Sequence, residues 1–102
     1  MIRVSVMYPN EPGKRFDWDY YLNRHKAMEQ QELGALGMVR TEADKGIGTV
    51  QPGVPAPFVA VGYMYFNSMA DMQRCLPRAA EIMADVPNFT DVRPQIQISE
   101  IV

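Results

Sequence analysis

The only histidine in the chain, His25, lies in the segment FDWDYYLNRHKAM and shares a helical stripe with three aromatic or apolar residues. These are Trp18, Tyr21 and Leu22, and positions 18, 21, 22 and 25 follow the i, i+3, i+4, i+7 spacing of one helix face. Imidazole exchanges protons readily near neutral pH. The pattern predicts an inward-facing His25 that acts as a general acid or base. The alternative is a core histidine that is hydrogen-bonded to a backbone carbonyl or a tyrosine.

Several large side chains could surround a ligand beside His25. Tyr21 could orient the imidazole or donate a hydrogen bond to a ligand carbonyl. The same residue types at helix and strand spacing also build ordinary cores, so both interpretations stay open. Eight methionines could form a soft pocket wall or simply fill gaps. The candidate substrate-binding residues are Trp18, Tyr21, Tyr63, Met64 and Tyr65.

Metal chemistry has little support in the sequence. A zinc site needs several ligands at fixed spacing, and the chain has one histidine and one cysteine, Cys75, far apart in the sequence. Cys75 has no neighbouring charge pattern typical of a reactive thiol, so we expect a small buried side chain. We therefore predict neither a metal nor an organic cofactor.

Composition indicates one globular domain over residues 1–102. Hydrophobic residues make up 47% and charged residues 22% of the 102 positions. The net charge of −2 lacks any basic run, which argues against a nucleic-acid partner. The longest apolar run, Phe58 to Phe66, is too short to cross a bilayer. No secretory signal pattern follows Met1, so we expect a cytoplasmic protein without a membrane partner.

The first half of the chain reads as strand, helix, strand. Residues 2–8 alternate apolar and polar side chains and end at Pro9, which is typical of a strand. A helix should run from Asp17, its N-cap, to Leu33, and Gly34 should end it. A second strand is predicted over residues 36–43. The glycines and prolines of residues 44–57 predict an irregular loop.

The second half repeats the order strand, helix, strand. Residues 58–66 form the strongest strand pattern. Ser68 followed by Asp71 resembles a capping box and predicts the start of a second helix. Pro77 should break or kink that helix near Cys75. A last strand is predicted over residues 92–102. This βαββαβ order is typical of a ferredoxin-like α+β fold, with an antiparallel sheet and two helices on one face.

The strand over residues 58–66 is apolar on both faces. Val59, Val61, Tyr63 and Tyr65 should point to one side, with Phe58, Met64 and Phe66 on the other. Two helices on one side leave the other face uncovered. We therefore predict a homodimer in which two sheets pack face to face as a dimeric α+β barrel.

The chain resembles the EthD family, which is named for ethyl tert-butyl ether degradation. The resemblance spans nearly the whole chain and is strongest in RFDWDYYLNRHKAM, PGVPAPFVAVGYMYF and IMADVPNFTDVRPQIQISEIV. It implies the dimeric α+β barrel fold. It also implies an association with the degradation of small hydrophobic compounds.

Many members of the wider superfamily are cofactor-free enzymes that act on hydrophobic substrates between sheet and helices. In one lactone-isomerase branch, a helix histidine like His25 lies at the active site. The resemblance therefore favours acid or base catalysis by His25. The alternative is a non-catalytic binding or accessory protein that sequesters or delivers a small hydrophobic ligand, alongside an oxygenase system.

Overall fold

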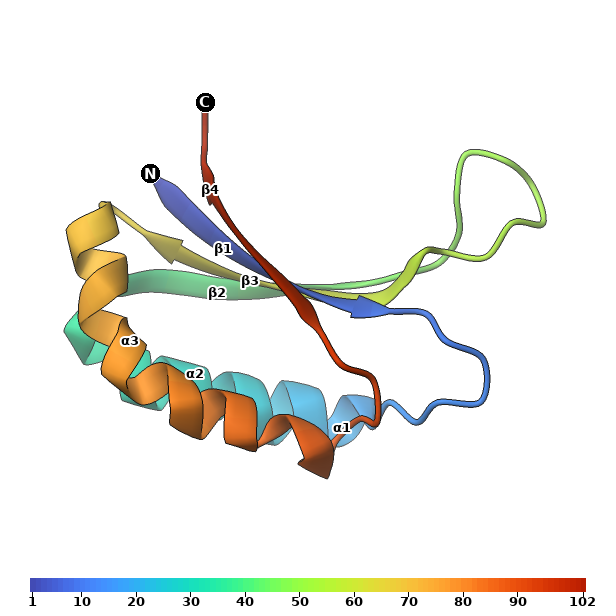
Figure 1. Ribbon diagram of the computed structural model, residues 1–102, viewed down its shortest axis with the longest axis horizontal. Coiled ribbons are helices and arrows are strands. Elements are labelled where there is room, and N and C mark those ends of the chain that lie inside the picture. The colour runs from blue at the N-terminus through green and yellow to red at the C-terminus, as the bar shows by residue number, and fades with distance from the viewer.

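The computed structural model covers residues 1–102 and forms one antiparallel sheet with all of its helices on one face (Figure 1). The strands lie side by side in the order β2-β3-β1-β4. They are β1 (Ile2–Pro9), β2 (Met38–Lys45), β3 (Phe58–Phe66) and β4 (Gln95–Glu100). The main helices are α1 (Trp18–Tyr20), α2 (Lys26–Leu33) and α3 (Met69–Ala84). This arrangement confirms the predicted ferredoxin-like βαββαβ fold.

The predicted first helix forms, but it contains a wide turn. The Asp17 carboxylate caps α1 by accepting a hydrogen bond from the Tyr20 backbone N–H at 3.1 Å. Residues 21–25 then form a π-helical turn that leads into α2. The prediction that Leu22 shares the inward helix face was wrong, because Leu22 is 51% exposed, while Tyr21 and His25 are buried. A π turn holds more residues than an α turn, so the inward face passes from Tyr21 to His25 and Lys26, and Leu22 rotates outward.

The second helix begins where it was predicted and continues past Pro77. Ser68 caps α3 by accepting a hydrogen bond from the Asp71 backbone N–H, as the capping pattern indicated. Of the two outcomes predicted for Pro77, a break or a kink, the break is wrong, because the helix is uninterrupted from Met69 to Ala84. Figure 1 shows that the helix bends along its length. A bend accommodates the lost hydrogen bond and the proline ring without ending the helix.

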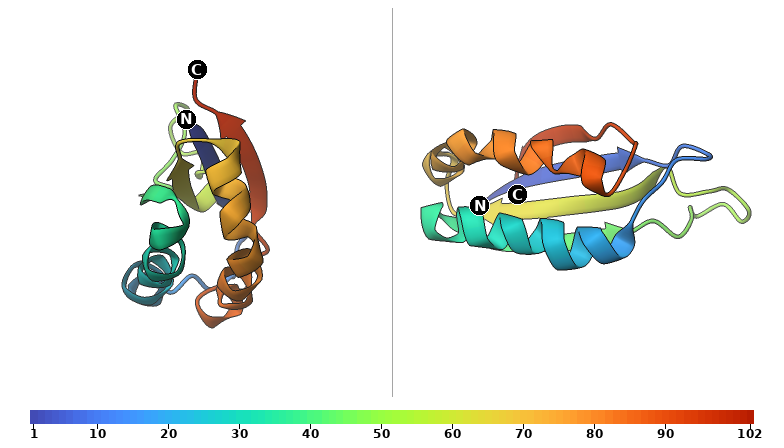
Figure 2. Two further views of the ribbon diagram at one scale, coloured as in Figure 1. Left: turned by 90° about the vertical axis from the view of Figure 1, so that its left-hand side faces the viewer. Right: turned by 90° about the horizontal axis from the view of Figure 1, so that it is seen from below.

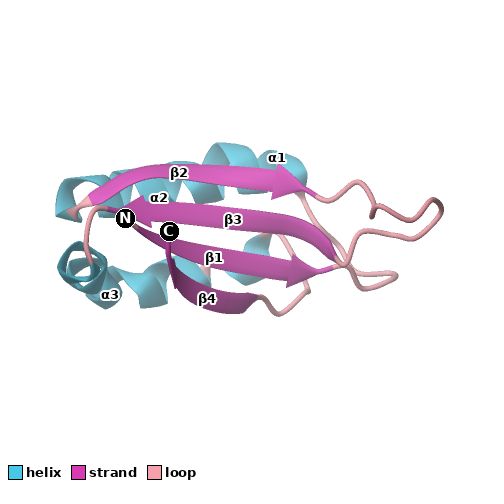
Figure 3. Ribbon diagram, turned by 90° about the horizontal axis from the view of Figure 1, so that it is seen from above, coloured by secondary structure: helices cyan, strands magenta, loops and turns pink.

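Boundaries of the other elements shift by a few residues. The α-helix ends before Gly34, as predicted, but the chain reverses at Gly37, whose φ of 125° suits glycine. β2 consequently begins at Met38. β4 is shorter than the predicted last strand. The segment between β2 and β3 has no helix or strand and projects from the end of the sheet (Figure 3).

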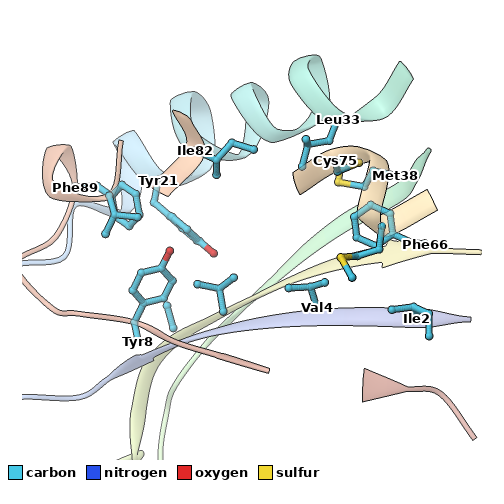
Figure 4. Packing of buried hydrophobic residues seen from close by; sticks show 14 of the residues in the cluster. Ile2, Val4, Tyr8, Tyr21, Leu33, Met38, Phe66, Cys75, Ile82 and Phe89 are labelled. Carbon is cyan, nitrogen blue, oxygen red and sulfur yellow. The ribbon is translucent and has the colours of Figure 1, made fainter. Parts of the chain in front are cut away.

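The core lies between the sheet and the helices. Figure 4 shows β1 side chains such as Val4 and Tyr8 pointing toward Tyr21, Ile82 and Phe89 from the helical layer and the turn after it. The register pairs Val4 with Met64 and Ser5 with Tyr63, so Met64 shares the core face while Tyr63 points to the opposite face. The predicted alternation of β3 is thereby confirmed. Cys75 is buried in the core, as expected.

The opposite face of the sheet carries no helix (Figure 2). Half-buried aromatic and apolar residues occupy its centre, and the Arg3 and Arg40 guanidinium groups lie over the rings of Tyr63 and Tyr65 at 5.3 and 3.9 Å. The Arg3 Nε atom is buried and has no hydrogen-bond partner. We call this surface the open face. Separately, no helix of the protein has both the length and the apolar character that a membrane span requires.

Candidate functional site

A cavity of about 170 Å³ lies between the core face of the sheet and helices α2 and α3. Its walls are mostly aliphatic and sulfur-containing side chains from β1, β3, β4 and the helices. Leu76, Ile96 and Ile98 are each about half exposed, which places the cavity entrance between α3 and β4. Only three lining residues carry polar groups: Tyr8, His25 and Glu29. The cavity is therefore an apolar chamber with a small set of polar groups, as ligand sites commonly are.

His25 is 2% exposed and is held by the turn that follows α3. Its Nδ1 lies 2.9 Å from the Asp85 carboxylate. The other oxygen of that carboxylate accepts hydrogen bonds from the Tyr20 hydroxyl at 2.6 Å and the Asn88 amide at 2.9 Å. A carboxylate can only accept, so the neutral imidazole carries its proton on Nδ1 and leaves the Nε2 lone pair free. Asp85 thus fixes both the orientation and the tautomer of His25.

The pKa of Asp85 reflects these contacts. Burial alone would raise the pKa of this carboxyl, but hydrogen bonds from Tyr20, Asn88 and His25 outweigh burial and hold the pKa below its ordinary value. Asp85 therefore remains ionised over the neutral range and keeps accepting from the imidazole.

The second ring nitrogen of His25 faces another carboxylate. Nε2 lies 3.5 Å from Glu29 Oε2, which is longer than a normal hydrogen bond. The other Glu29 oxygen is occupied by the Lys26 ammonium at 2.9 Å and the Thr41 hydroxyl at 2.9 Å. Lys26 offsets the charge that Glu29 brings into the core. Because Nε2 does not form a normal hydrogen bond with Glu29, a ligand in the cavity can contact it.

Two tyrosine hydroxyls lie near the same end of the cavity. Tyr8 and Tyr21 pack edge to face with centroids 5.9 Å apart, and Figure 4 shows their hydroxyls pointing toward one another. The Tyr21 hydroxyl is buried without a hydrogen-bond partner. Burial, and after it the charge of Glu29, raises the pKa of Tyr8, so its phenol stays neutral and can donate a hydrogen bond. The pKa of Tyr21 is also raised, chiefly by burial.

The predicted site residues do not all gather at this cavity. His25 and Met64 line it. Tyr21 stacks on the imidazole at 5.8 Å between centroids, behind the cavity wall. Trp18 packs against Phe16 and Tyr21 and lies outside the lining. Tyr63 and Tyr65 lie on the open face, across the sheet from His25.

Three residues at the site were not among the sequence candidates: Tyr8, Glu29 and Asp85. Glu29 follows His25 by four residues, so helical spacing could have paired them. Tyr8 stands on the apolar side of the first strand, which could have directed it toward the helices. Asp85 is 60 positions from His25, and no local pattern connects them. Among His, Cys, Asp and Glu side chains, no group of three or more is arranged to hold a metal ion.

Comparisons with known proteins agree with this architecture. The family model described as the EthD domain matches residues 13–93. An EthD-like protein from Ralstonia eutropha JMP134 has a crystal structure that superposes with a TM-score of 0.90 at 37% identity, covering 99% of this chain and 91% of that one. No curated protein matched.

More distant structures share the fold alone. An ethyl tert-butyl ether degradation family protein from Bacillus halodurans C-125 gives a TM-score of 0.66 at 15% identity, covering 100% and 99% of the two chains. A dimeric protein of unknown function and ferredoxin-like fold from Bacteroides fragilis gives 0.52 at 11% identity, covering 98% and 95%. The matched domain spans most of the chain. This protein therefore belongs to the EthD family.

Proposed function

We propose that this protein binds a small hydrophobic compound in the cavity and that His25 moves a proton on it as general acid or base. The observation that carries the proposal is the Asp85–His25 pair at the polar end of an apolar chamber. Asp85 holds the proton on Nδ1, so Nε2 can take a proton from a bound molecule and return it. A positioned acid or base of this kind contributes about 10² to 10⁴ in rate. The reaction uses the protein's own side chains.

The family name suggests the setting of this chemistry. A structural relative is described as an ethyl tert-butyl ether degradation family protein, so we place this protein in the breakdown of small hydrophobic compounds. Met64, Met72 and Met83 line the cavity, and their flexible side chains suit ligands of irregular shape.

We also propose that a second copy of the chain covers the open face. Val59, Val61 and Tyr63 leave apolar surface there, and the buried Arg3 Nε atom lacks an acceptor. The sheet of a partner copy would bury this apolar surface and can supply a hydrogen-bond acceptor for Arg3 Nε. The dimeric fold neighbour from Bacteroides fragilis supports this assembly as an analogy.

The catalytic proposal is tested by hydrogen–deuterium exchange at carbon. One-ring compounds with an acidic C–H bond, such as cyclohexanone and nitrocyclohexane, are incubated with protein in D₂O, and loss of the proton signal is followed by NMR. We expect the wild-type protein to accelerate exchange of at least one probe. His25→Asn should lower that acceleration by about 10² or more.

Arg24→Asn is the matched control, because Arg24 is exposed on the neighbouring position and should leave the rate unchanged. Probe binding with exchange at the buffer rate would instead support a non-catalytic binding protein and refute catalysis by His25.

A further inference from the structure

The polar groups of the cavity define the chemical class of ligand that it fits. Tyr8 is 1% exposed, lines the cavity and makes no side-chain hydrogen bond within the chain. Because Tyr8 lines the cavity, its hydroxyl can donate a hydrogen bond to an acceptor that a ligand supplies. Nothing else in the mechanism uses this hydroxyl.

Tyr8 and His25 lie at the same end of the cavity. Both pack on Phe89, with centroid distances of 5.7 Å for Tyr8 and 4.6 Å for His25. Both also pack on Tyr21, at 5.9 and 5.8 Å. A ligand atom that accepts a hydrogen bond from the Tyr8 hydroxyl therefore lies at the same end of the cavity as the His25 imidazole.

Charge and volume restrict the ligand further. Glu29 faces the cavity and is paired with Lys26, and no lysine or arginine lines the cavity, so an anionic ligand would find no free cation there. A cavity of about 150 Å³ holds benzene in another protein, so the 170 Å³ here suits a molecule of about one ring. The apolar walls favour a hydrocarbon body.

We propose that the ligand is a neutral, ring-sized carbonyl compound, and that the Tyr8 hydroxyl donates a hydrogen bond to its carbonyl oxygen. This inference rests on the proposed function and names its substrate class. His25 Nε2 takes a proton from the carbon beside the carbonyl. The C–H electron pair forms a carbon–carbon double bond, and the carbonyl π pair moves to the oxygen, where Tyr8 stabilises the enolate.

The cycle closes without another reactant. The imidazolium can exchange its proton with the solvent and deliver a solvent deuteron to the same carbon, which gives exchange, or it can deliver its proton to a different carbon of an unsaturated ligand, which gives an isomer. His25 is neutral again after either path, and no electrons are gained or lost. Tyr21 can support Tyr8 in this step, because its own unpartnered hydroxyl points toward the Tyr8 hydroxyl (Figure 4).

The test compares two ligands of nearly the same shape, cyclohexanone and methylenecyclohexane, which differ in the carbonyl oxygen. Each is titrated by NMR into the wild-type protein and into Tyr8→Phe. Loss of one net hydrogen bond should weaken cyclohexanone binding about fivefold. Methylenecyclohexane should bind both proteins with affinities that differ less than twofold. An equal effect of the substitution on both ligands, or no effect on either, would overturn the role of Tyr8.

A second measurement does not depend on the folding of the variant. The carbonyl ¹³C shift of bound, labelled cyclohexanone in the wild-type protein should be that of a hydrogen-bonded ketone. A shift equal to that of cyclohexanone in a hydrocarbon solvent would overturn the inference.

The two proposals fail separately. If cyclohexanone binding depends on Tyr8 but no probe exchanges, the carbonyl site stands and catalysis by His25 is refuted. If nitrocyclohexane exchanges through His25 while cyclohexanone shows no dependence on Tyr8, catalysis stands and the carbonyl assignment is refuted. If neither ligand binds, both proposals are refuted.

Discussion

Replacement of Asp85 tests the architecture of the site without any knowledge of the ligand. Asp85→Ala removes the acceptor for His25 Nδ1, and the ring is 2% exposed, so water cannot easily replace it. A buried donor left without a partner costs about 1 to 3 kcal/mol of unfolding free energy. For a domain of this size each kcal/mol lowers the melting temperature by about 4 to 8 °C. Urea and thermal unfolding followed by circular dichroism would measure both quantities.

The pH dependence of this effect has a defined sign. The pKa of Asp85 is lower in the folded protein than its ordinary value of 3.8, so its ionised form stabilises the fold. That contribution is complete above pH 3.8 and is lost as the pH falls through the lower folded-state pKa. The stability difference between wild type and Asp85→Asn should therefore be constant near neutral pH and shrink in strong acid. A difference that grew on acidification would contradict the assignment.

The single histidine permits a direct check of the tautomer. In the neutral ring, long-range ¹H–¹⁵N spectra should show Nδ1 protonated and Nε2 bare in the wild-type protein. Asp85→Ala should remove that preference. A wild-type ring protonated on Nε2 would refute the argument that Asp85 orients His25 as a base.

Two further predictions concern the sheet. Gly62→Ala should lower the free energy of unfolding by about 1 to 3 kcal/mol in urea titrations. The reason is that the added Cβ would lie 2.6 Å from the Tyr21 hydroxyl oxygen. Unchanged stability would mean that Tyr21 does not pack on Gly62. Val61→Asp should convert the proposed dimer into an 11.6 kDa monomer in sedimentation experiments, because it places a charge in the centre of the open face. Ile47→Asp, in an exposed loop, is its control, and a wild-type protein that sediments as a monomer at micromolar concentration would refute the dimer itself.

Local sequence patterns were sufficient to predict the order of strands and helices in this chain. Alternation over residues 2–8 and 58–66 specifies strands, and the caps Asp17 and Ser68 mark where helices begin. These signals are local, because hydrogen bonds and side-chain directions within one element depend on residues a few positions apart. The same local logic correctly placed His25 on an inward helix face.

Other features depended on contacts that only the folded chain makes. The π turn rotates Leu22 outward, and α3 stays continuous through Pro77 although proline removes a backbone donor. Asp85 reaches His25 across 60 positions, and Tyr8 comes from a different element again. The spacing of residues within one element does not indicate contacts between residues that are far apart in the sequence. The sequence therefore identified His25 as the candidate residue, whereas the tertiary structure decided its partners, its cavity and which aromatic residues face away from it.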